Sequence, residues 1–205
     1  AAGILPPGFP GYNPDLQGYT YDPDKARQLI QDSKYGGLDE LPRITLTLPG
    51  SFGAAVSPSI EAMLAMWEEN LDVRINLLQT EWAIFLQDLH QKRFQMFGGL
   101  GWIADYPDPQ NFLDVLLHST SIDNNVGGYN NAEFDRLLEQ ARSEINHDQR
   151  TALYRQAEQV LMDDAGIIPL FHAPDYVLTK PHVKGFAIGP LGIPLLQNVV
   201  IADRE

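Results

Sequence analysis

ITLTL (residues 44–48), SPSIEAMLAMW (57–67) and VRINL (73–77) are three consecutive segments that decide the fold. In the first and third segments apolar and polar side chains alternate, which is typical of a half-buried strand. In the second, Ser57-Pro58 precedes apolar residues at helical spacing, which predicts a helix with Trp67 on its apolar face. A strand–helix–strand order favours an α/β domain with a partly parallel sheet.

The same alternation of helices and strands extends in both directions. Asp22-Pro23 is a typical helix start, with an N-cap residue followed by proline, and Gly36-Gly37 ends that helix. Downstream, the patterns predict a helix over 82–90, a strand over 94–100, helices that follow Asp108-Pro109, Asn130-Asn131 and Asp148, and paired strands over 167–171 and 176–178.

Residues 1–21 and the residues from 181 onward differ from the rest. Both stretches are rich in proline and glycine and show no helical period. We interpret the first as an extended, ordered strap whose tyrosines pack on the domain, and the second as a tail that ends in a strand at 199–201. The chain does not begin with methionine or a signal peptide, so we expect a processed chain or a piece of a longer one.

Composition excludes several classes of function. The chain has 205 residues and no cysteine, so thiol catalysis, disulfide scaffolds and Cys-ligated metal sites are excluded. Its formal net charge of −13 repels nucleic acid and anionic membranes, so neither is expected as a partner. Every apolar run is far shorter than the ~20 residues that span a bilayer.

One glycine-rich stretch matches a sequence pattern that is found in nucleotide-binding sites. GLGWIA (99–104) fits the loose dinucleotide pattern, but that pattern needs a helix directly afterwards to hold the phosphates. Pro107 and Pro109 prevent such a helix, and Asp105 would repel a phosphate. We therefore predict no nucleotide site here.

Asp105 is the most informative polar residue in this stretch. It lies between Trp102 and Tyr106, just beyond a predicted strand, and ligand crevices of open α/β sheets lie at the carboxyl ends of strands. A carboxylate among aromatic rings suits a cationic ligand group, although on spacing alone a salt bridge or loop cap is the favoured explanation. Trp82, at a strand–helix junction, and Trp102 could line a cleft or pack in the core.

GWIADYPDPQNFL (101–113) resembles the signature of family 5 extracellular solute-binding proteins, the peptide and nickel receptors of ABC importers. Other pieces resemble the family in the same order across residues 3–200, namely YDPDKA (21–26), Trp67 with the 73–77 strand, EW (81–82) before FL (85–86), GYNN (128–131) with FD (134–135), AGIIP (165–169) and VKGF (183–186).

The resemblance implies one lobe of a type II periplasmic-binding-protein fold, with a mixed sheet flanked by helices. Residues 1–205 would form a single ligand-binding lobe, with a strap (1–21), an α/β core (22–180) and a tail (181–205) that returns toward the hinge. The implied partners are the ligand, an opposing lobe of the same parent chain and an ABC permease in the membrane. The implied location is periplasmic or extracellular, with a membrane tether, if any, upstream of residue 1.

The resemblance also implies a ligand site without cofactor or metal. In peptide-binding members the aspartate of the Trp-x-x-Asp element pairs with the ligand's α-ammonium, and this position is Asp105. Trp82 and Trp102 would flank side-chain pockets, and Tyr106 and Asn111 are further ligand-binding candidates. Some oligopeptide receptors carry an arginine three residues before the motif tryptophan, where this chain has Gly99, so the resemblance leaves peptide length open.

We therefore expect a solute-binding component of an ABC importer, not an enzyme, that captures oligopeptides by lobe closure. One alternative is another solute, either an oligosaccharide stacked on Trp82 and Trp102 or a nickel or other metal chelate. A remote alternative is a glycoside hydrolase that uses Asp105 and Asp114, which would need carboxyl separations of ~5 Å or ~6.5–9.5 Å across an open cleft.

Overall fold

The computed structural model describes residues 1–50, 55–121, 123–174, 176–189 and 191–203. The chain divides into two compact units. We call Thr20–Gly101 the sheet unit, and Ala1–Tyr19 together with Trp102–Glu205 the helical unit. That the whole chain acts as one ligand-binding lobe stays a prediction.

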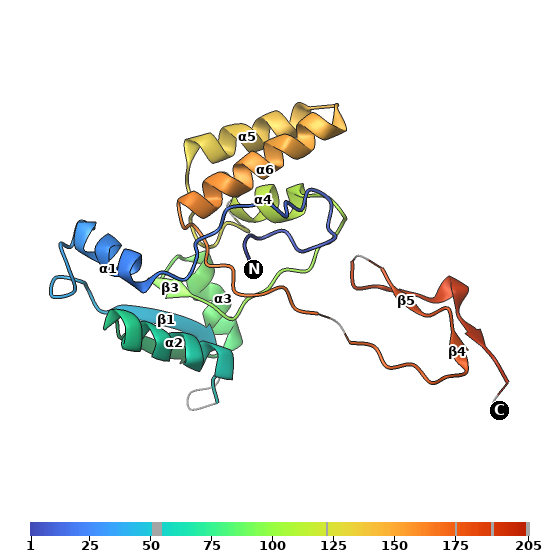
Figure 1. Ribbon diagram of the computed structural model, residues 1–205, viewed down its shortest axis with the longest axis horizontal. Coiled ribbons are helices and arrows are strands. Elements are labelled where there is room, and N and C mark those ends of the chain that lie inside the picture. Colours follow the sequence, from blue (N-terminus) through green and yellow to red (C-terminus); the bar gives the residue numbers. More distant parts are fainter. Residues whose placement is uncertain (51–54, 122, 175, 190, 204–205) are drawn as a thin grey trace. The chain divides into compact units, whose positions relative to one another are not determined.

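The sheet unit is built on a three-stranded parallel sheet (Figure 1). Its strand order is β2-β1-β3, so the chain crosses from β1 to β2 and then back past β1 to β3. Because parallel crossovers are right-handed, α2 and α3 cover opposite faces. The elements are α1 (Pro23–Asp32), β1 (Ile44–Pro49), α2 (Pro58–Leu71), β2 (Ile75–Thr80), α3 (Trp82–His90) and β3 (Met96–Phe97).

Local sequence signals account for most of these boundaries. Asp22 caps α1, where its side chain accepts a hydrogen bond from the Lys25 backbone N–H at 2.9 Å, as predicted from Asp22-Pro23. The alternating residues Leu46 and Leu48 are buried against Ile60 of α2. Two boundaries differ from expectation, since β2 begins at Ile75 rather than at residue 73, and β3 is only two residues long.

The short β3 corrects the predicted strand over 94–100. Gly98 and Gly99 follow it directly, and Gly99 has φ +75°, a left-handed conformation that cannot continue a strand. The backbone N–H of Gly98 still donates to the Thr47 carbonyl at 3.1 Å. The chain therefore turns away from the carboxyl end of the sheet four residues before Trp102.

The helical unit contains α4 (Gln110–Leu117), α5 (Ala132–Ser143) and α6 (His147–Asp163). Asn131 and Asn146 cap α5 and α6 through their side-chain oxygens. The helices α5 and α6 lie side by side along their lengths (Figure 1). Their apolar faces, together with α4, enclose a core that includes Leu113, Phe134, Leu138, Tyr154, Ala157 and Leu161.

The first 19 residues complete this core. They contain no helix or strand, yet Leu5, Phe9 and Leu16 are buried in it, and the Phe9 ring meets that of Phe112 edge-on at 5.1 Å. The Leu5 backbone N–H donates to Glu158 Oε1 at 2.9 Å. An ordered strap packed on the domain was predicted for this stretch, although Tyr19 is exposed rather than packed.

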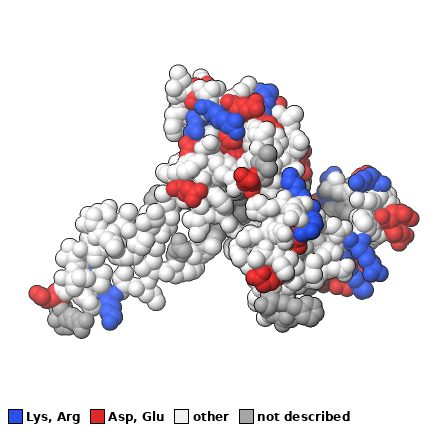
Figure 2. Space-filling model, turned by 180° about the vertical axis from the view of Figure 1, so that it is seen from behind, with Lys and Arg blue, Asp and Glu red and all other residues white. Residues whose placement is uncertain are grey.

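The last segment carries two antiparallel strand pairs. β4 (Val183–Lys184) pairs with β7 (Val200–Ile201), and β5 (Ala187–Ile188) pairs with β6 (Pro194–Leu195), followed by the short 3₁₀ helix η1 (Leu196–Asn198). We expected one mixed sheet. In the structure the parallel strands form one sheet, and the antiparallel strands form two separate pairs. Figure 2 shows few charged side chains on this segment, whereas acidic and basic side chains mix elsewhere on the face shown.

The paired strands predicted over 167–171 and 176–178 are wrong. The described residues of both stretches form no strand, and Phe171 and Leu178 are exposed. Pro169 removes a backbone donor from the middle of the first stretch, which weakens any ladder there. Apolar residue type alone therefore misled the prediction.

Candidate ligand-binding site

Asn111 is the centre of a hydrogen-bonded cluster in the helical unit. It lies in the first turn of α4 and is 1% exposed. Its Oδ1 accepts from the indole Nε1–H of Trp102 at 2.8 Å and from the backbone N–H of Asp105 at 3.0 Å. Its Nδ2 donates to Asp105 Oδ2 at 3.2 Å. One buried amide thus holds both predicted site residues of the Trp-x-x-Asp element.

Asp105 presents a carboxylate on the surface of this cluster. The residue is exposed, and Oδ2 accepts the Asn111 bond. Among the described residues, none donates a hydrogen bond to Oδ1, and none forms an ion pair with this carboxylate. The salt-bridge explanation left open by the sequence therefore has no partner in the described part of the chain. Asp105 has one oxygen fixed and one free.

The two aromatic neighbours of Asp105 are partly exposed. Trp102 is 40% and Tyr106 is 38% exposed. The Tyr106 hydroxyl donates to Gln110 Oε1 at 2.7 Å, so this ring is also tied to the first turn of α4. Indole and phenol rings with one hydrogen-bonded end and a free face can offer apolar area to a ligand.

Asp108 and Arg150 anchor the start of α4. Asp108 Oδ1 accepts from the Gln110 backbone N–H at 2.9 Å, which confirms its predicted role as a helix cap. Arg150 of α6 donates to both carboxylate oxygens, at 2.7 and 2.9 Å. Burial opposes ionisation of Asp108, but the bonds from Arg150 and the backbone outweigh it and lower the pKa of this carboxyl. The loop that carries Asp105 is therefore attached to two helices.

Trp82 belongs to the sheet unit. It is the first residue of α3, just after the carboxyl end of β2, and its ring stacks on that of Phe85 at 6.0 Å. At 51% exposed, it is not the core residue that its type alone allowed. Trp102 and Trp82 therefore belong to different units.

Gly99 lies three residues before Trp102, at the position where the resemblance led us to look for an arginine. Its φ of +75° disfavours any other residue, and a Cβ there would lie 3.1 Å from Pro49 Cδ. The backbone thus explains why this position carries no side chain.

Asp114 is unsuited to acid–base catalysis with Asp105. It is 3% exposed within α4, and Arg142 of α5 donates to both of its oxygens at 2.6 Å. A carboxylate held in this way is an ion-paired structural group. Among the described residues, no three His, Asp or Glu side chains gather closely enough to hold a metal ion.

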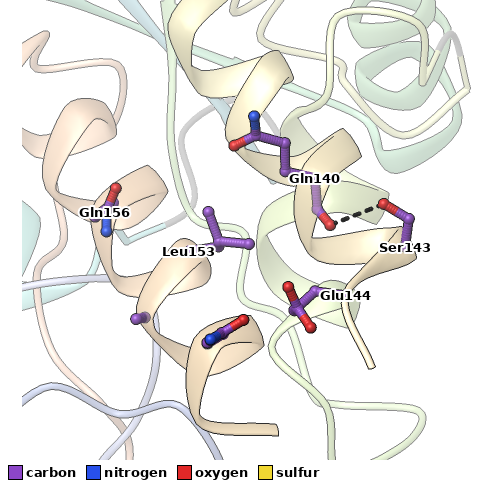
Figure 3. Close-up of a pocket in the computed structure, with 7 residues that line it drawn as sticks. Gln140, Ser143, Glu144, Leu153 and Gln156 are labelled. Atoms are coloured by element: carbon purple, nitrogen blue, oxygen red, sulfur yellow. Dashed lines mark hydrogen bonds between the residues drawn. The ribbon is translucent and has the colours of Figure 1, made fainter. Parts of the chain in front are cut away.

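A separate groove of about 460 Å³ lies between α5 and α6 (Figure 3). It is lined by side chains such as Gln140, Glu144, Leu153 and Gln156, and it includes none of the predicted site residues. A hydrogen bond from Ser143 Oγ to the Gln140 carbonyl, at 3.1 Å, closes one end of α5. We assign no function to this groove.

The sequence missed the residues that support the site. Arg150 lies 42 positions from its partner Asp108, so no local pattern could have linked them. Asn111 was proposed as a ligand contact, whereas the structure shows it buried under Asp105 and Trp102.

Comparisons with known proteins bear on the family and the fold of this chain. Residues 1–124 match the model of the bacterial extracellular solute-binding proteins, family 5 Middle. Haem-binding protein A of Haemophilus influenzae is 34% identical over 98% of this chain and 36% of that protein. Oligopeptide-binding protein OppA of Bacillus subtilis is 29% identical over 97% of this chain and 37% of that protein. The murein tripeptide binding protein MppA of Escherichia coli superposes with a TM-score of 0.79, at 26% identity, over 100% of this chain and 40% of that one.

The chain thus spans little more than a third of the length of these curated relatives. No helix among the described residues is long and apolar enough to cross a membrane. The fold is that of periplasmic binding proteins, with a parallel sheet flanked by helices. The chain belongs to family 5 of the bacterial extracellular solute-binding proteins.

Proposed function

We propose that this chain is the ligand-binding lobe of an ABC-importer receptor for oligopeptides, and that Asp105 binds the peptide's free α-ammonium. The observation that carries the proposal is the exposed carboxylate with one fixed and one free oxygen, flanked by Trp102 and Tyr106. An ammonium needs such an acceptor, and a site that recognises the peptide backbone can leave side chains loosely specified.

The mechanism would be capture by closure against an opposing lobe. While Asp105 is exposed to water, its attraction for an ammonium is weak. Closure would exclude water and strengthen the contact, with the Trp102 ring next to the carboxylate in the sequence motif and Trp82 as a separate aromatic candidate in the sheet unit. Names of relatives support peptides as the ligand class, because they include oligopeptide, dipeptide and murein tripeptide binding proteins.

The wider setting follows from the family. The receptor would work in the periplasm or on the outside of the cell, tethered or free, and would deliver its ligand to an ABC permease.

Haem is the second candidate ligand. A haem-binding protein is 34% identical to this chain over 98% of it, and a structure named HbpA2 from Haemophilus parasuis is also similar. Trp102 and Trp82 could stack on a porphyrin as readily as on a peptide side chain. An oligosaccharide or a metal chelate would use the same aromatic surfaces.

Calorimetric titration of the full-length protein tests the proposal. One pool contains di- to pentapeptides with free amino termini, and the other contains the same peptides N-acetylated. We expect heat from the free-amino pool alone. Equal binding of both pools would reject the ammonium anchor, and silence from both together with a Soret shift on adding haemin would favour haem.

The variant Asp105→Asn should weaken free-amino peptides by roughly 2–5 kcal/mol, the range for removing one partner of a desolvated charge pair. Asp39→Asn is the matched control, because Asp39 is an exposed carboxylate of the sheet unit and its loss changes the net charge equally. A loss below about 0.5 kcal/mol in Asp105→Asn would assign this residue to the loop structure only.

A further inference from the structure

We infer that Asn111 is a positioning residue that couples the indole of Trp102 to the carboxylate of Asp105, and so sets the ammonium site before any ligand arrives. This inference rests on the proposed function for its consequence in binding, but its geometry can be tested without ligand. Asn111 acts through its two neighbours because it is 1% exposed and has little surface to offer a ligand.

The hydrogen bonds fix which way the amide points. Two N–H donors, the Trp102 indole and the Asp105 backbone, converge on Asn111 Oδ1. A flipped amide would place its NH₂ group against both donors and lose both bonds. Only the observed orientation also lets Nδ2 donate to Asp105 Oδ2. The amide, the indole and the carboxylate therefore have one mutually consistent arrangement.

In this arrangement the two oxygens of the Asp105 carboxylate have different roles. Oδ2 is held by Asn111, while Oδ1 accepts no hydrogen bond from the described residues. Rotation of the carboxylate about its bond to Cβ is thus restrained, and the free oxygen is kept in place for an incoming donor. Groups that are preorganised in this way bind more tightly because less freedom is lost on binding.

Helix α4 gives Asn111 a rigid mount. The first turn of α4 is held by Asp108 and, through it, by Arg150 of α6. The next residues, Phe112 and Leu113, are buried in the core. Movement of Asn111 would therefore disturb the core. The loop that carries Trp102 and Asp105 is thus held, through Asn111, by a helix that is packed in this core.

The first test uses the full-length protein without ligand. The NMR signal of the Trp102 indole N–H, assigned by its loss in Trp102→Phe, should move upfield in Asn111→Ala. In Asn111→Asp the acceptor oxygens remain, so the indole bond should survive, but the donor to Asp105 is lost and a second negative charge lies beside it. We expect the indole signal to stay downfield in this nearly isosteric variant, which, if Asn111→Ala fails to fold, tests the inference through its affinity for the peptide.

The second test measures the affinity for a free-amino peptide from the titrated pool. Asn111→Ala should weaken binding about tenfold, the scale of one lost hydrogen bond to a charged group. Asn111→Asp should also weaken it, because Asp105 Oδ2 loses its donor, despite the intact indole bond. In an Asp105→Asn background the further loss from Asn111→Ala should shrink to less than about threefold, because residues that act through one another are not additive.

Asn125→Ala is the matched control. Asn125 is also a buried asparagine of the helical unit, 3% exposed, and its side chain bonds to the backbone of Leu117, His118 and Tyr129. Its loss should lower stability without moving the Trp102 indole signal or the affinity for the peptide.

The outcomes separate the inference from the proposed function. An unmoved indole signal in Asn111→Ala, or equal losses of affinity with and without Asp105, would overturn the positioning role. A moved indole signal with no effect of Asp105→Asn on peptide binding would support the Asn111 geometry and reject Asp105 as the anchor.

Discussion

The sheet unit and the helical unit bury different kinds of side chain. Among the described residues, the buried polar or charged side chain of the sheet unit is Thr47, and its buried cluster is the apolar contact of β1 with α2. The helical unit buries a whole set of polar groups, namely Asn111, Asp114, His118, Asn125 and Glu158. The sheet unit is thus specified by apolar alternation, whereas the helical unit also depends on buried polar groups, of which His118 Nε2 and Glu158 Oε2 have no hydrogen-bond partner among the described residues.

The two candidate tryptophans follow the same division. Trp102 of the helical unit is fixed at its indole nitrogen by Asn111, whereas Trp82 of the sheet unit is held by stacking on Phe85. A hydrogen bond fixes direction, while stacking permits sliding. We therefore expect the Trp102 ring to be the more rigid of the two and the Trp82 ring the more adaptable.

The largest expected effect compares the two cores. Leu138→Ala, in the helical unit, should lower the free energy of unfolding by about 4 kcal/mol, and Leu48→Ala, in the sheet unit, by about 2–3 kcal/mol. Leu138 is 0% exposed and surrounded by three helices, so its cavity cannot collapse, whereas Leu48 is 5% exposed on a small sheet. Urea unfolding, followed by circular dichroism, measures the free energy of unfolding of both variants. Equal losses would contradict the expected difference between the two cores.

The next effect compares two ion pairs. Arg142→Ala leaves the buried Asp114 without its partner and should cost about 2 kcal/mol, toward the low end for a buried pair because the Arg142 side chain is 45% exposed. Arg74→Ala breaks the exposed Arg74–Glu68 pair of the sheet unit and should cost under about 0.5 kcal/mol. Similar losses from the two variants in urea titrations would contradict a structural role for the Asp114 network.

A smaller effect concerns the contact of the strap with α6. Burial raises the pKa of the Glu158 carboxyl above its ordinary 4.5, although the Leu5 and Ile4 backbone N–H groups oppose the rise. The native state therefore holds the proton to a higher pH than the unfolded state does. The resulting stabilisation is fully present below pH 4.5 and declines as pH rises toward the native pKa, by at most about 1.4 kcal/mol per pH unit.

The variant Glu158→Gln has no proton to lose and should remove this decline. Its unfolding midpoint should change less than that of the native sequence between pH 4.5 and pH 7. Glu40→Gln, at an exposed site of the sheet unit, is the control and should track the native curve. Parallel curves for the native sequence and Glu158→Gln would show that this carboxyl does not titrate in the window.

The smallest effect separates the two tryptophans. Trp102→Phe removes one donor from Asn111 Oδ1 and should lower stability by about 1 kcal/mol, the net value of a hydrogen bond. Trp82→Phe keeps a ring that can stack on Phe85 and should change stability by under about 0.5 kcal/mol. Thermal unfolding of both variants measures the two losses, and a larger loss at Trp82 would reverse the assignment of the more rigid and the more adaptable ring.

Much of this structure was accessible from local pattern. The N-cap at Asp22, the alternation over 44–48 and the helix over 82–90 were predicted, because capping and periodicity act between residues close in the sequence. The strands predicted over 167–171 and 176–178 failed because an apolar run forms a strand only where a partner edge exists. In the site, Asp105, Trp102 and Tyr106 are neighbours in the sequence, so their common motif was visible.

Short motifs and local periods were enough to identify the family, the α/β class and the element that carries the candidate site. How that element is held depends on contacts that form only in the folded chain. Arg150 contacts Asp108, 42 positions away, and Glu158 contacts Leu5, 153 positions away. The burial of Asn111 and its hydrogen bond to Asp105 likewise depend on the folded chain. Such pairings arise from the packing of helices into one core, and no local signal in the sequence encodes them.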